Sequence, residues 1–382
     1  MLSMHHPLVG AGLPIWLPDG AAARHAVEAY LYELERRAGY RHVYSPPLAR
    51  RELYERSGHL PLFADDMFGE LPDLGLVLRP SLCPHHAMVY AERGRSYRDL
   101  PLRVGELGDM YRNERSGVLN GLWRVRAISL NDGHVFCAPE QAVEEVREVL
   151  RLMRQAHQAL GVRVHRVRLS LRSPEGGKYV DDPRAWAWAD SVLRDALDDV
   201  DYDEVPGEAA FYGPKVDVQV LDAAGRQWSL ATVQVDVHQP VAFGLSYVDS
   251  SGARQRPVMV HRSLVGILER LFAHLSEVHG GAFPAWYAPR QVAVLPVGPE
   301  QDAPAAAFAR RCVDAGLRAE AVYAGSLAAR VHDAVGVPFV AVLGAREVAD
   351  DAVSLRGGPE LLSTGSALAE LVRRCAPPPI YP

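Results

Sequence analysis

Hydrophobic residues in the first part of the chain repeat with helical and strand-like spacings in turn. From residue 21 to 37 the apolar positions recur at helical spacing and stop near Gly39, which predicts a helix. The next segment, HVYSPPL, predicts a strand that ends at Pro46, because proline forces an extended exit from a regular ladder. Residues 139–160 predict a second helix, with valine, leucine and methionine on one face and charged residues opposite.

The pattern changes to short alternating runs from Val164 onward. The runs VHRVRLSLR, KVDVQVLD and QWSLATVQVDV are separated by turn residues such as those at 222–225. Alternation of this kind is typical of strands with one buried face, so these runs predict adjacent antiparallel strands. A helix over about 263–277, with leucines at core spacing, is predicted to pack against them.

Glycine and proline cluster in the segment GGAFPAWYAPRQ, between that predicted helix and a new apolar strand. Such residues mark a linker, so we expect one domain over residues 1–288 and a second over 289–382. The second part alternates apolar strands (VAVLPV, LRAEAVY and PFVAVLG) with helical stretches, which predicts a small α/β domain with a largely parallel sheet. The chain as a whole is expected to be an α+β protein.

The composition is that of an ordinary globular protein, since 48% of the 382 residues are hydrophobic and 23% are charged. A formal net charge of -6 argues against non-specific adhesion to nucleic acid, so any such contact must use a local basic face. Four cysteines without a CxxC motif favour a reducing compartment, and no segment has the apolar length of a membrane span. We therefore expect a cytoplasmic protein without a membrane partner.

Several arginines gather in the segment PLRVGELGDMYRNERSGVLNGLWRVRAISLNDGHVFC, near two strand patterns and a glycine-containing loop. Arginine is always charged and fork-shaped, which suits paired contacts to phosphate oxygens. A phosphate site is one interpretation, and a solvated, charged strand face is the other. Composition alone does not decide between them.

An ordered series of motifs resembles the catalytic core of class II aminoacyl-tRNA synthetases, in particular the threonyl-tRNA synthetases. The segment AGYRHVYSPPL is similar to their motif 1, and SGHLPLFADDMF, SYRDLPLR, RVGELGDMYRNERSGVLNGLWRVR, NDGHVFC and AFYGPKVD follow in family order. RPVMVHRSLVGILER resembles motif 3, and the last domain resembles the anticodon-binding domain of the family. The resemblance runs from about His5 to the end and implies an antiparallel-sheet catalytic core followed by an anticodon-binding-type α/β domain.

The resemblance implies an ATP site, with Mg²⁺ accompanying the nucleotide. Arg112 in YRNE is expected to contact the α-phosphate, and Glu114 to hold the adenine amino group. Arg124 and Arg270 are expected to clamp the outer phosphates of a bent ATP, and Lys215 in FYGPK to support the substrate carboxylate or the α-phosphate. Arg112, Arg270 and Lys215 are thus the predicted catalytic residues. Fixed cations suit adenylate formation, because negative charge develops on the α-phosphorus and the departing pyrophosphate.

A Zn²⁺ ion is the second implied cofactor, because Cys83 in RPSLCPHH, His134 in NDGHVFC and His261 in VMVHR match the family's ligands. Their wide spacing alone would suggest ordinary buried residues. One thiolate and two imidazoles leave an open position, which in the family receives the amino and hydroxyl groups of threonine and rejects valine. Four nearby residues match no ligand position and are predicted to serve packing or polar surface: His59, His85, His86 and Cys137.

The amino-acid pocket is implied by Asp132, Tyr212 and Gln234, which match residues that hold the threonine ammonium and hydroxyl groups. The chain departs from the family at Leu130, where a glutamine is usual, and at Ile267, where a serine is usual. Loss of hydrogen-bonding groups shifts substrate preference strongly. The metal ligands restrict the expected substrates to threonine or a related β-substituted amino acid that chelates through its amine and its β-substituent.

Further departures lie outside that pocket. In the last domain the family's anticodon-contact pattern is altered near Ala324 and at Gly357 or Gly358, whereas Glu347 is retained, so anticodon recognition is expected to be weakened. A leucine-lined wall of the family's active site carries Gln239 here, together with Phe243. The chain begins where the family's core begins, so the N-terminal and editing domains are expected to be absent.

Three hypotheses follow. The first is a threonine–tRNA ligase that uses ATP, threonine and tRNA and forms a homodimer through motif 1, either a housekeeping enzyme or a specialised or inhibitor-resistant paralogue. The second is an aminoacyl-adenylate ligase that passes the acyl group to a carrier protein or a small-molecule amine. The third is a non-catalytic protein on a synthetase scaffold, which the retained arginines and metal ligands disfavour.

Overall fold

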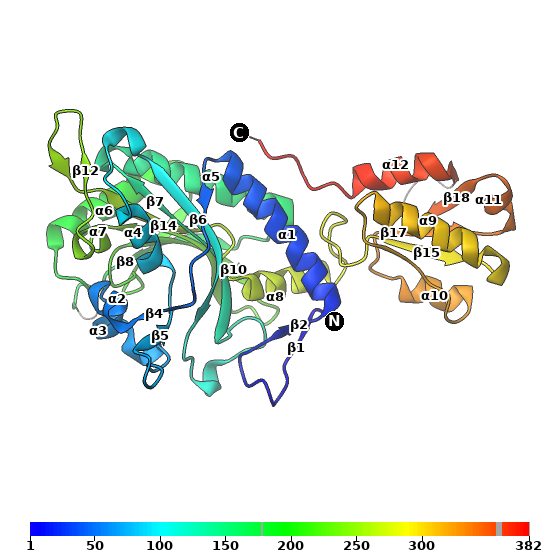
Figure 1. Ribbon diagram of the computed structural model, residues 1–382, viewed down its shortest axis with the longest axis horizontal. Coiled ribbons are helices and arrows are strands. Elements are labelled where there is room, and N and C mark those ends of the chain that lie inside the picture. The colour runs from blue at the N-terminus through cyan, green and yellow to red at the C-terminus, as the bar shows by residue number, and fades with distance from the viewer. Residues whose placement is uncertain (177–178, 357–360, 382) are drawn as a thin grey trace.

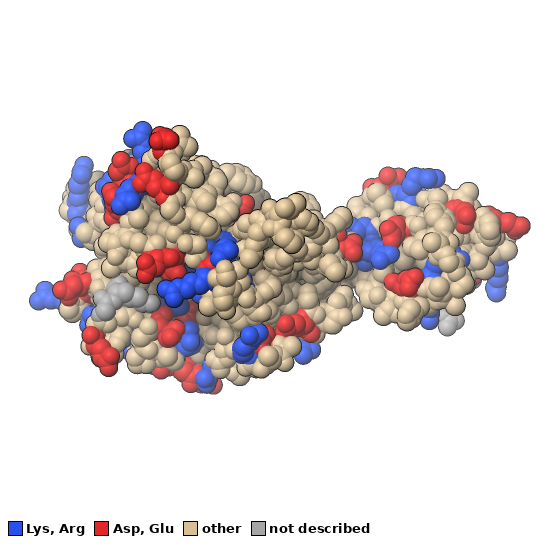
Figure 2. All heavy atoms as spheres, turned by 90° about the horizontal axis from the view of Figure 1, so that it is seen from below, with Lys and Arg blue, Asp and Glu red and all other residues tan. Residues whose placement is uncertain are grey.

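The computed structural model describes residues 1–176, 179–356 and 361–381, so Gly357 and Gly358 lie outside the described residues. Figure 1 shows two bodies, a larger one around a long curved sheet and a smaller one that holds the last strands and helices. Figure 2 shows a narrow waist between them, with acidic and basic side chains interspersed on both. That face of the molecule thus presents mixed charge rather than a broad patch of one sign.

The larger body is organised by an eight-stranded sheet. Neighbouring strands pair antiparallel except at the two edges, where β3 is parallel to β6 and β8 is parallel to β9. The antiparallel pairing predicted for the alternating runs is confirmed. In spatial order the strands are β3 (Arg41–His42), β6 (Leu102–Tyr111), β7 (Ala127–Cys137), β14 (Val258–Ser263), β11 (Gln227–Asp236), β10 (Lys215–Leu221), β8 (Arg166–Leu171) and β9 (Tyr202–Pro206).

The first predicted strand is shorter than the HVYSPPL run suggests. Its pairing is limited to Arg41–His42, and the following backbone turns toward side chains of the sheet. The backbone N–H of Ser45 donates to the Glu106 carboxylate at 3.1 Å instead of a neighbouring strand. The two prolines that follow have no N–H to extend the ladder.

Alternation along the strands divides the sheet into an apolar face and a polar face. Val135, Val235 and Val260 are fully buried in the main hydrophobic core. On the other face the register places His134 opposite His261 and, one strand further, His261 opposite Gln234. The sheet therefore gathers polar side chains from several strands in one place.

Four helices cover the apolar face and contribute to the same core. They are α1 (Pro18–Arg37), α5 (Ala142–Leu160), α6 (Pro183–Ala196) and α8 (Leu268–His279). The helix predictions for residues 21–37 and 139–160 are confirmed, although residues 139–141 form a separate 3-10 turn.

The predicted start of the helix over 263–277 is wrong, because α8 begins at Leu268 and Ser263 ends β14. Leu264 is buried in the core although it lies before the helix. Its apolar side chain fits the helical spacing of the leucines that follow, so the sequence pattern did not separate the end of the strand from the start of the helix. Between them Gly266 has φ +68°, and a Cβ there would lie 1.9 Å from the Leu230 carbonyl oxygen. A glycine is needed for the chain to turn from strand to helix here.

A buried ion pair ties α1 to the sheet. Arg262 on β14 lies 2.9 Å from the Glu35 carboxylate, and both side chains are almost inaccessible. Glu35 also accepts from Asn131 Nδ2 at 2.7 Å. A Cβ at Gly133 would lie 2.4 Å from the Arg262 guanidinium carbon, so glycine makes room for this arginine inside the sheet.

Short elements surround the polar face. The paired strands are β1 (Ser3–Met4) with β2 (Ile15–Trp16), β4 (Leu48–Arg50) with β5 (Leu76–Leu78), and β12 (Tyr247–Val248) with β13 (Arg254–Gln255). The helices are α2 (Arg51–Arg56), α3 (His59–Phe63), α4 (Cys83–Ala91) and α7 (Gln239–Ala242). The 3-10 turns are Ala64–Asp66, Tyr97–Asp99, Ser116–Val118, Pro139–Gln141 and, in the smaller body, Pro299–Gln301.

The smaller body has a five-stranded sheet and a separate apolar core. In spatial order its strands are β16 (Ala319–Ala321), β15 (Val292–Pro296), β17 (Phe339–Leu343), β18 (Ala352–Arg356) and β19 (Leu362–Ser363). Its helices are α9 (Asp302–Asp314), α10 (Leu327–Asp333), α11 (Ala345–Ala349) and α12 (Thr364–Arg374).

The parallel pairing predicted for the second part holds for β16, β15 and β17, whereas β18 and β19 pair antiparallel. The connection between β17 and β18 contains only the short helix α11. A parallel return needs a longer crossover, so the chain reverses direction instead. Within the described ranges, no helix has the length and hydropathy needed to cross a bilayer.

Candidate active site

Three buried side chains converge on the polar face of the sheet. Cys83 is the first residue of α4, His134 lies on β7 and His261 lies opposite it on β14. The candidate ligand atoms of these residues all lie within 4.8 Å of one another. His134 Nε2 and His261 Nδ1 are 3.0 Å apart.

A chain of side chains orients His134. Its Nδ1 lies 2.7 Å from His86 Nδ1, and His86 Nε2 lies 3.1 Å from the Glu106 carboxylate. These bonds are satisfied together when His86 donates to Glu106 and His134 donates to His86 through Nδ1. That tautomer leaves the lone pair of His134 Nε2 facing His261 and Cys83. Burial and the neighbouring His261 and His86 lower the pKa of His134 well below its ordinary value, so its ring is neutral.

A carboxylate orients His261 in the same way. His261 Nε2 donates to Asp236 Oδ2 at 2.8 Å, and Nδ1 faces His134 and Cys83. Burial lowers the pKa of His261, but the hydrogen bonds to Asp236 and Cys83 outweigh it and raise the pKa to about 10, so Nδ1 carries a proton that a bound metal would displace. Asp236 is fully buried at the end of β11. Imidazole rings that bind metals commonly donate their other N–H to a carboxylate in this manner. The two nitrogens and one sulfur are therefore prepared as a donor set.

The Cys83 sulfur has several polar neighbours. Gln239 Nε2 donates to Sγ at 3.2 Å, Ser81 Oγ lies at 3.3 Å and His59 Nε2 lies at 3.9 Å. Burial by itself raises the pKa of the Cys83 thiol, but His59 and His261 outweigh it and lower the pKa to about 5. The thiolate form that a metal requires is thus favoured.

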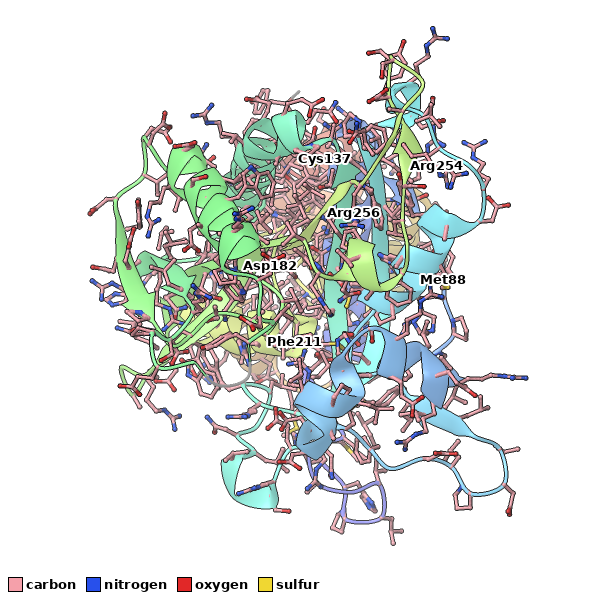
Figure 3. All side chains as sticks on the ribbon, turned by 90° about the vertical axis from the view of Figure 1, so that its left-hand side faces the viewer. Met88, Cys137, Asp182, Phe211, Arg254 and Arg256 are labelled. Atoms are coloured by element: carbon pink, nitrogen blue, oxygen red, sulfur yellow. The ribbon has the colours of Figure 1, made fainter. Side chains whose placement is uncertain are left out.

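Two residues that the sequence analysis assigned to packing or polar surface have a different place. His86 is fully buried and bonded to His134, and His59 is buried and bonded to Ser57 and Ser81 beside Cys83. That prediction is wrong for both, because strand and helix packing brings them into contact with the cluster. It holds for His85 and Cys137, which are buried without contact to the three residues; Cys137 lies inside the larger body in Figure 3.

A cavity of about 240 Å³ opens beside the cluster. Asp132, Tyr212 and Gln234 line it. The Tyr212 hydroxyl donates to Gln234 Oε1 at 2.7 Å, and its ring stacks on His261 with centroids 4.6 Å apart. Burial raises the pKa of Asp132 to about 6. The predicted amino-acid residues are therefore brought together next to the candidate metal ligands.

Leu130 and Ile267 lie side by side on another wall of this cavity. They form an isolated antiparallel bridge and share an apolar cluster with Leu82 and Met110. The two departures from the family pattern thus form one continuous apolar surface. They change the same wall rather than two separate positions.

The predicted ATP residues line this cavity and a larger one of about 560 Å³ that adjoins it. Arg112 donates to the Pro80 carbonyl at 3.4 Å, and Arg270 donates to the carbonyls of Trp123 and Ser229 at 3.1 and 2.6 Å. Burial and the positive charges of Arg112 and Arg124 lower the pKa of Arg270 to about 10. At neutral pH the group remains charged, so Arg270 keeps a cation at the wall of the smaller cavity.

The remaining predicted residues have partners within the site. Arg124 pairs with the Glu114 carboxylate at 2.7 Å, and Lys215 Nζ lies 3.2 Å from the buried Asp217. Phe211, labelled in Figure 3 near α2 and α3, packs edge-on against His59 at the rim of the larger cavity. The two cavities adjoin each other, because four residues line both: Arg112, Tyr212, Lys215 and Gln234.

Comparison with known proteins assigns this arrangement to a class. Residues 71–279 match the family described as the tRNA synthetase class II core domain (G, H, P, S and T), and residues 291–360 match the anticodon binding domain. The antiparallel sheet and the arginine-lined cavity therefore belong to a class II aminoacyl-tRNA synthetase core.

Individual relatives narrow the class to one family. The threonine–tRNA ligase of Halalkalibacterium halodurans is 45% identical over 377 residues, which cover 96% of this chain and 58% of that protein. The crystal structure of the RNA binding domain of threonyl-tRNA synthetase from Cryptosporidium parvum Iowa II is similar to this chain, with a TM-score of 0.92 and 31% identity. The match covers 99% of this chain and 96% of that chain. The chain belongs to the threonyl-tRNA synthetase family.

A putative threonyl-tRNA synthetase from Aeropyrum pernix has the same fold, with a TM-score of 0.80 and 26% identity over 98% of this chain and 92% of that one. The chain spans about three fifths of the length of the curated relatives it matches, as the 60% coverage of the Streptococcus pyogenes serotype M4 enzyme also shows.

Proposed function

We propose that this chain activates threonine, or a related β-substituted amino acid, with ATP and transfers the aminoacyl group to tRNA. The convergence of Cys83, His134 and His261 beside a cavity lined by Asp132 and Tyr212 carries this proposal. The adjoining arginine-lined cavity supplies room and charge for a nucleotide. No other arrangement within the described residues unites these features.

The donor set fits Zn²⁺. A thiolate and two neutral imidazole nitrogens are ligands that zinc prefers, and three protein ligands leave an open position. A zinc ion held there would bind the amine and the β-hydroxyl of the substrate. Valine has the amine but lacks the β-hydroxyl. Asp236, His86 and Glu106 fix the rings that would hold it.

The protein's side chains would hold the amino acid around that position. Asp132 lies at the cavity wall and offers a carboxylate to the substrate amine. Tyr212 and Gln234, which bond to each other, offer a hydroxyl and an amide to the substrate hydroxyl. The stacked pair of Tyr212 and His261 keeps these groups in place. A site built on polar partners rejects analogues that leave them unpaired.

Adenylate formation would take place where the two cavities meet. The substrate carboxylate attacks the α-phosphorus, and pyrophosphate departs with the bonding electrons. Arg112 would contact the α-phosphate, and Arg124 and Arg270 the outer phosphates, with Mg²⁺ accompanying ATP; the three arginines line the two cavities. Arg112, Arg270 and Lys215 are the proposed catalytic residues, because fixed cations stabilise the charge that develops in this step. Glu114 would release Arg124 and accept from the adenine amino group.

The acyl acceptor is proposed to be the terminal ribose of tRNA. A ribose hydroxyl would attack the adenylate carbonyl, and AMP would leave. The match of residues 291–360 to an anticodon binding domain supports tRNA. The relatives are named threonine–tRNA ligases, so a carrier protein or a small amine is not favoured.

A panel of amino acids in ATP/pyrophosphate exchange tests the substrate assignment. We expect threonine to give the highest rate, with serine or a 2,3-diamino acid next, and valine near background. Valine or another non-chelating amino acid as the best substrate would overturn the metal-based assignment. Charging of tRNA transcripts with labelled threonine tests the acceptor, and exchange without charging would restrict the activity to the first step.

We also propose a homodimer in the cytoplasm, with residues 1–288 as the catalytic domain and 289–382 as the anticodon-binding-type domain. Exposed aromatic residues support the dimer, since Tyr44 is 90% and Tyr32 47% accessible beside α1 and β3. Four free, buried cysteines support a reducing compartment. Sedimentation at micromolar concentration checks the dimer, and a monomer there would contradict it.

A further inference from the structure

Gln239 occupies an unusual position for a polar side chain. It is the first residue of α7 and is fully buried. Its Nε2 donates to Cys83 Sγ at 3.2 Å, while Oε1 has no hydrogen-bond partner among the described residues. The reversed amide would place its oxygen against the sulfur, and a metal-binding thiolate has no proton to donate to that oxygen. An unpaired buried carbonyl is costly, so packing alone would be better served by an apolar side chain.

One carboxylate places both Gln239 and a second member of the cluster. Asp236 Oδ1 accepts the backbone N–H groups of His238 and Gln239 at 2.7 and 2.9 Å, which starts α7. Asp236 Oδ2 accepts from His261 Nε2. The same buried group therefore fixes the ring of His261 and the backbone from which the amide reaches Cys83.

We infer that Gln239 is a positioning residue that holds the Cys83 thiolate for the metal site. The inference rests on the proposed function, because that function supplies the zinc ion toward which Cys83 acts. An N–H donor stabilises the negative charge of a thiolate and fixes the direction of its lone pairs. In a buried site this bond is stronger than in water.

The consequence concerns the open coordination position. A thiolate that shares its charge with an amide N–H donates less to the metal and leaves more positive charge there. The substrate amine and hydroxyl are then held more tightly. Gln239 thus acts on amino-acid binding through Cys83 and without touching the substrate.

Cobalt substitution tests the inference with a spectroscopic readout. Co²⁺ bound to this chain of 382 residues should give a thiolate-to-cobalt charge-transfer band. Gln239→Leu removes the N–H donor at similar volume, so the band should move to longer wavelength because the thiolate electrons are less stabilised. Val241→Ala is the control, since Val241 lies in α7 and is 49% accessible. Its band should match that of the unaltered protein.

Steady-state exchange gives a second readout on the zinc form. We expect KM for threonine to rise about 10-fold in Gln239→Leu, with a smaller change in kcat. Gln239→Met, which is unbranched and lacks the donor, should behave alike and serves if the leucine variant fails to fold. An unchanged band and an unchanged KM in both variants would overturn the inference and leave the proposed function standing. No charge-transfer band in the unaltered protein would instead contradict the metal site itself.

Discussion

The metal-ligand end and the arginine end of the cavity are oriented by different kinds of partner. At the first end carboxylates set the imidazole tautomers, as Asp236 does for His261 and Glu106 does through His86 for His134. At the second end backbone carbonyls hold Arg112 and Arg270. A carbonyl orients a guanidinium without neutralising it, whereas a carboxylate that accepts a hydrogen bond from one ring nitrogen directs the other ring nitrogen toward the candidate metal position. Each end is thereby left with the free group that its proposed ligand needs.

Arg124 is an exception to this division, because Glu114 neutralises it at 2.7 Å. Its side chain is also more exposed, at 42%. An exposed ion pair contributes little and exchanges partners readily. Under the proposed function, we therefore expect the outer-phosphate position to rearrange most when a nucleotide enters.

The largest expected effect comes from the arginine end. Arg270→Ala should lower kcat for pyrophosphate exchange by about 10²–10³-fold, because a fixed cation near the developing charge is lost. Bound zinc, measured by elemental analysis, should be unchanged if the two ends are independent. Arg290→Ala serves as the control, because Arg290 pairs with Glu320 in the smaller body. This variant should leave kcat and the zinc content unaltered. Loss of zinc in Arg270→Ala would show that the two ends of the cavity are not independent.

The next effect comes from the ligand end. Cys83→Ala should abolish stoichiometric zinc binding and reduce threonine-dependent exchange at least about 100-fold. This is more than the loss of a residue that only hydrogen-bonds a metal ligand costs. ATP affinity, measured by calorimetry, should stay the same because the arginines are untouched. Cys137→Ala is matched in residue type and burial, and it should retain its zinc. Equal metal content in Cys83→Ala and the unaltered protein would exclude Cys83 as a ligand.

A smaller effect is expected from the carboxylate behind His261. Asp236→Asn replaces an acceptor of the Nε2 proton with a group that no longer fixes the tautomer, so zinc affinity should fall about 10–100-fold. Competition with a chromophoric chelator measures this affinity. Asp222→Asn alters a buried carboxylate that caps the 222–226 turn away from the cluster, and its zinc affinity should be unaffected. Unchanged affinity in Asp236→Asn would mean that the ring is held by packing alone.

The smallest effect lies outside the cavity. Glu347 accepts the Gly344 N–H and the Ser354 hydroxyl, both at 2.9 Å, so it caps α11 within the smaller body. Glu347→Ala should destabilise that body by about 1 kcal/mol, with faster hydrogen exchange over residues 339–356. Pyrophosphate exchange should not change. A rise in KM for tRNA beyond the effect of destabilisation would show that the carboxylate also serves the anticodon contact expected from the family.

The sequence was sufficient to predict features that depend on residues close together in the chain. Alternation identified the antiparallel strands, and the motif series identified the arginines and the three candidate ligands that line the two cavities. Asp236 could also have been found, because it follows Gln234 by two residues and so shares its strand face. His86 follows Cys83 by three residues and shares its helix face. Neither spacing says which face meets the cluster.

The sequence by itself determined the main helices and strands, the family and the candidate site residues, because these depend on periodicity and on residue chemistry. Only the tertiary structure decided which buried polar groups are partners. It joined His86 and Glu106 to His134, set Leu130 against Ile267, and brought the amide of Gln239 to Cys83. These contacts link segments far apart in the chain, and register and helix packing fix them rather than any local pattern.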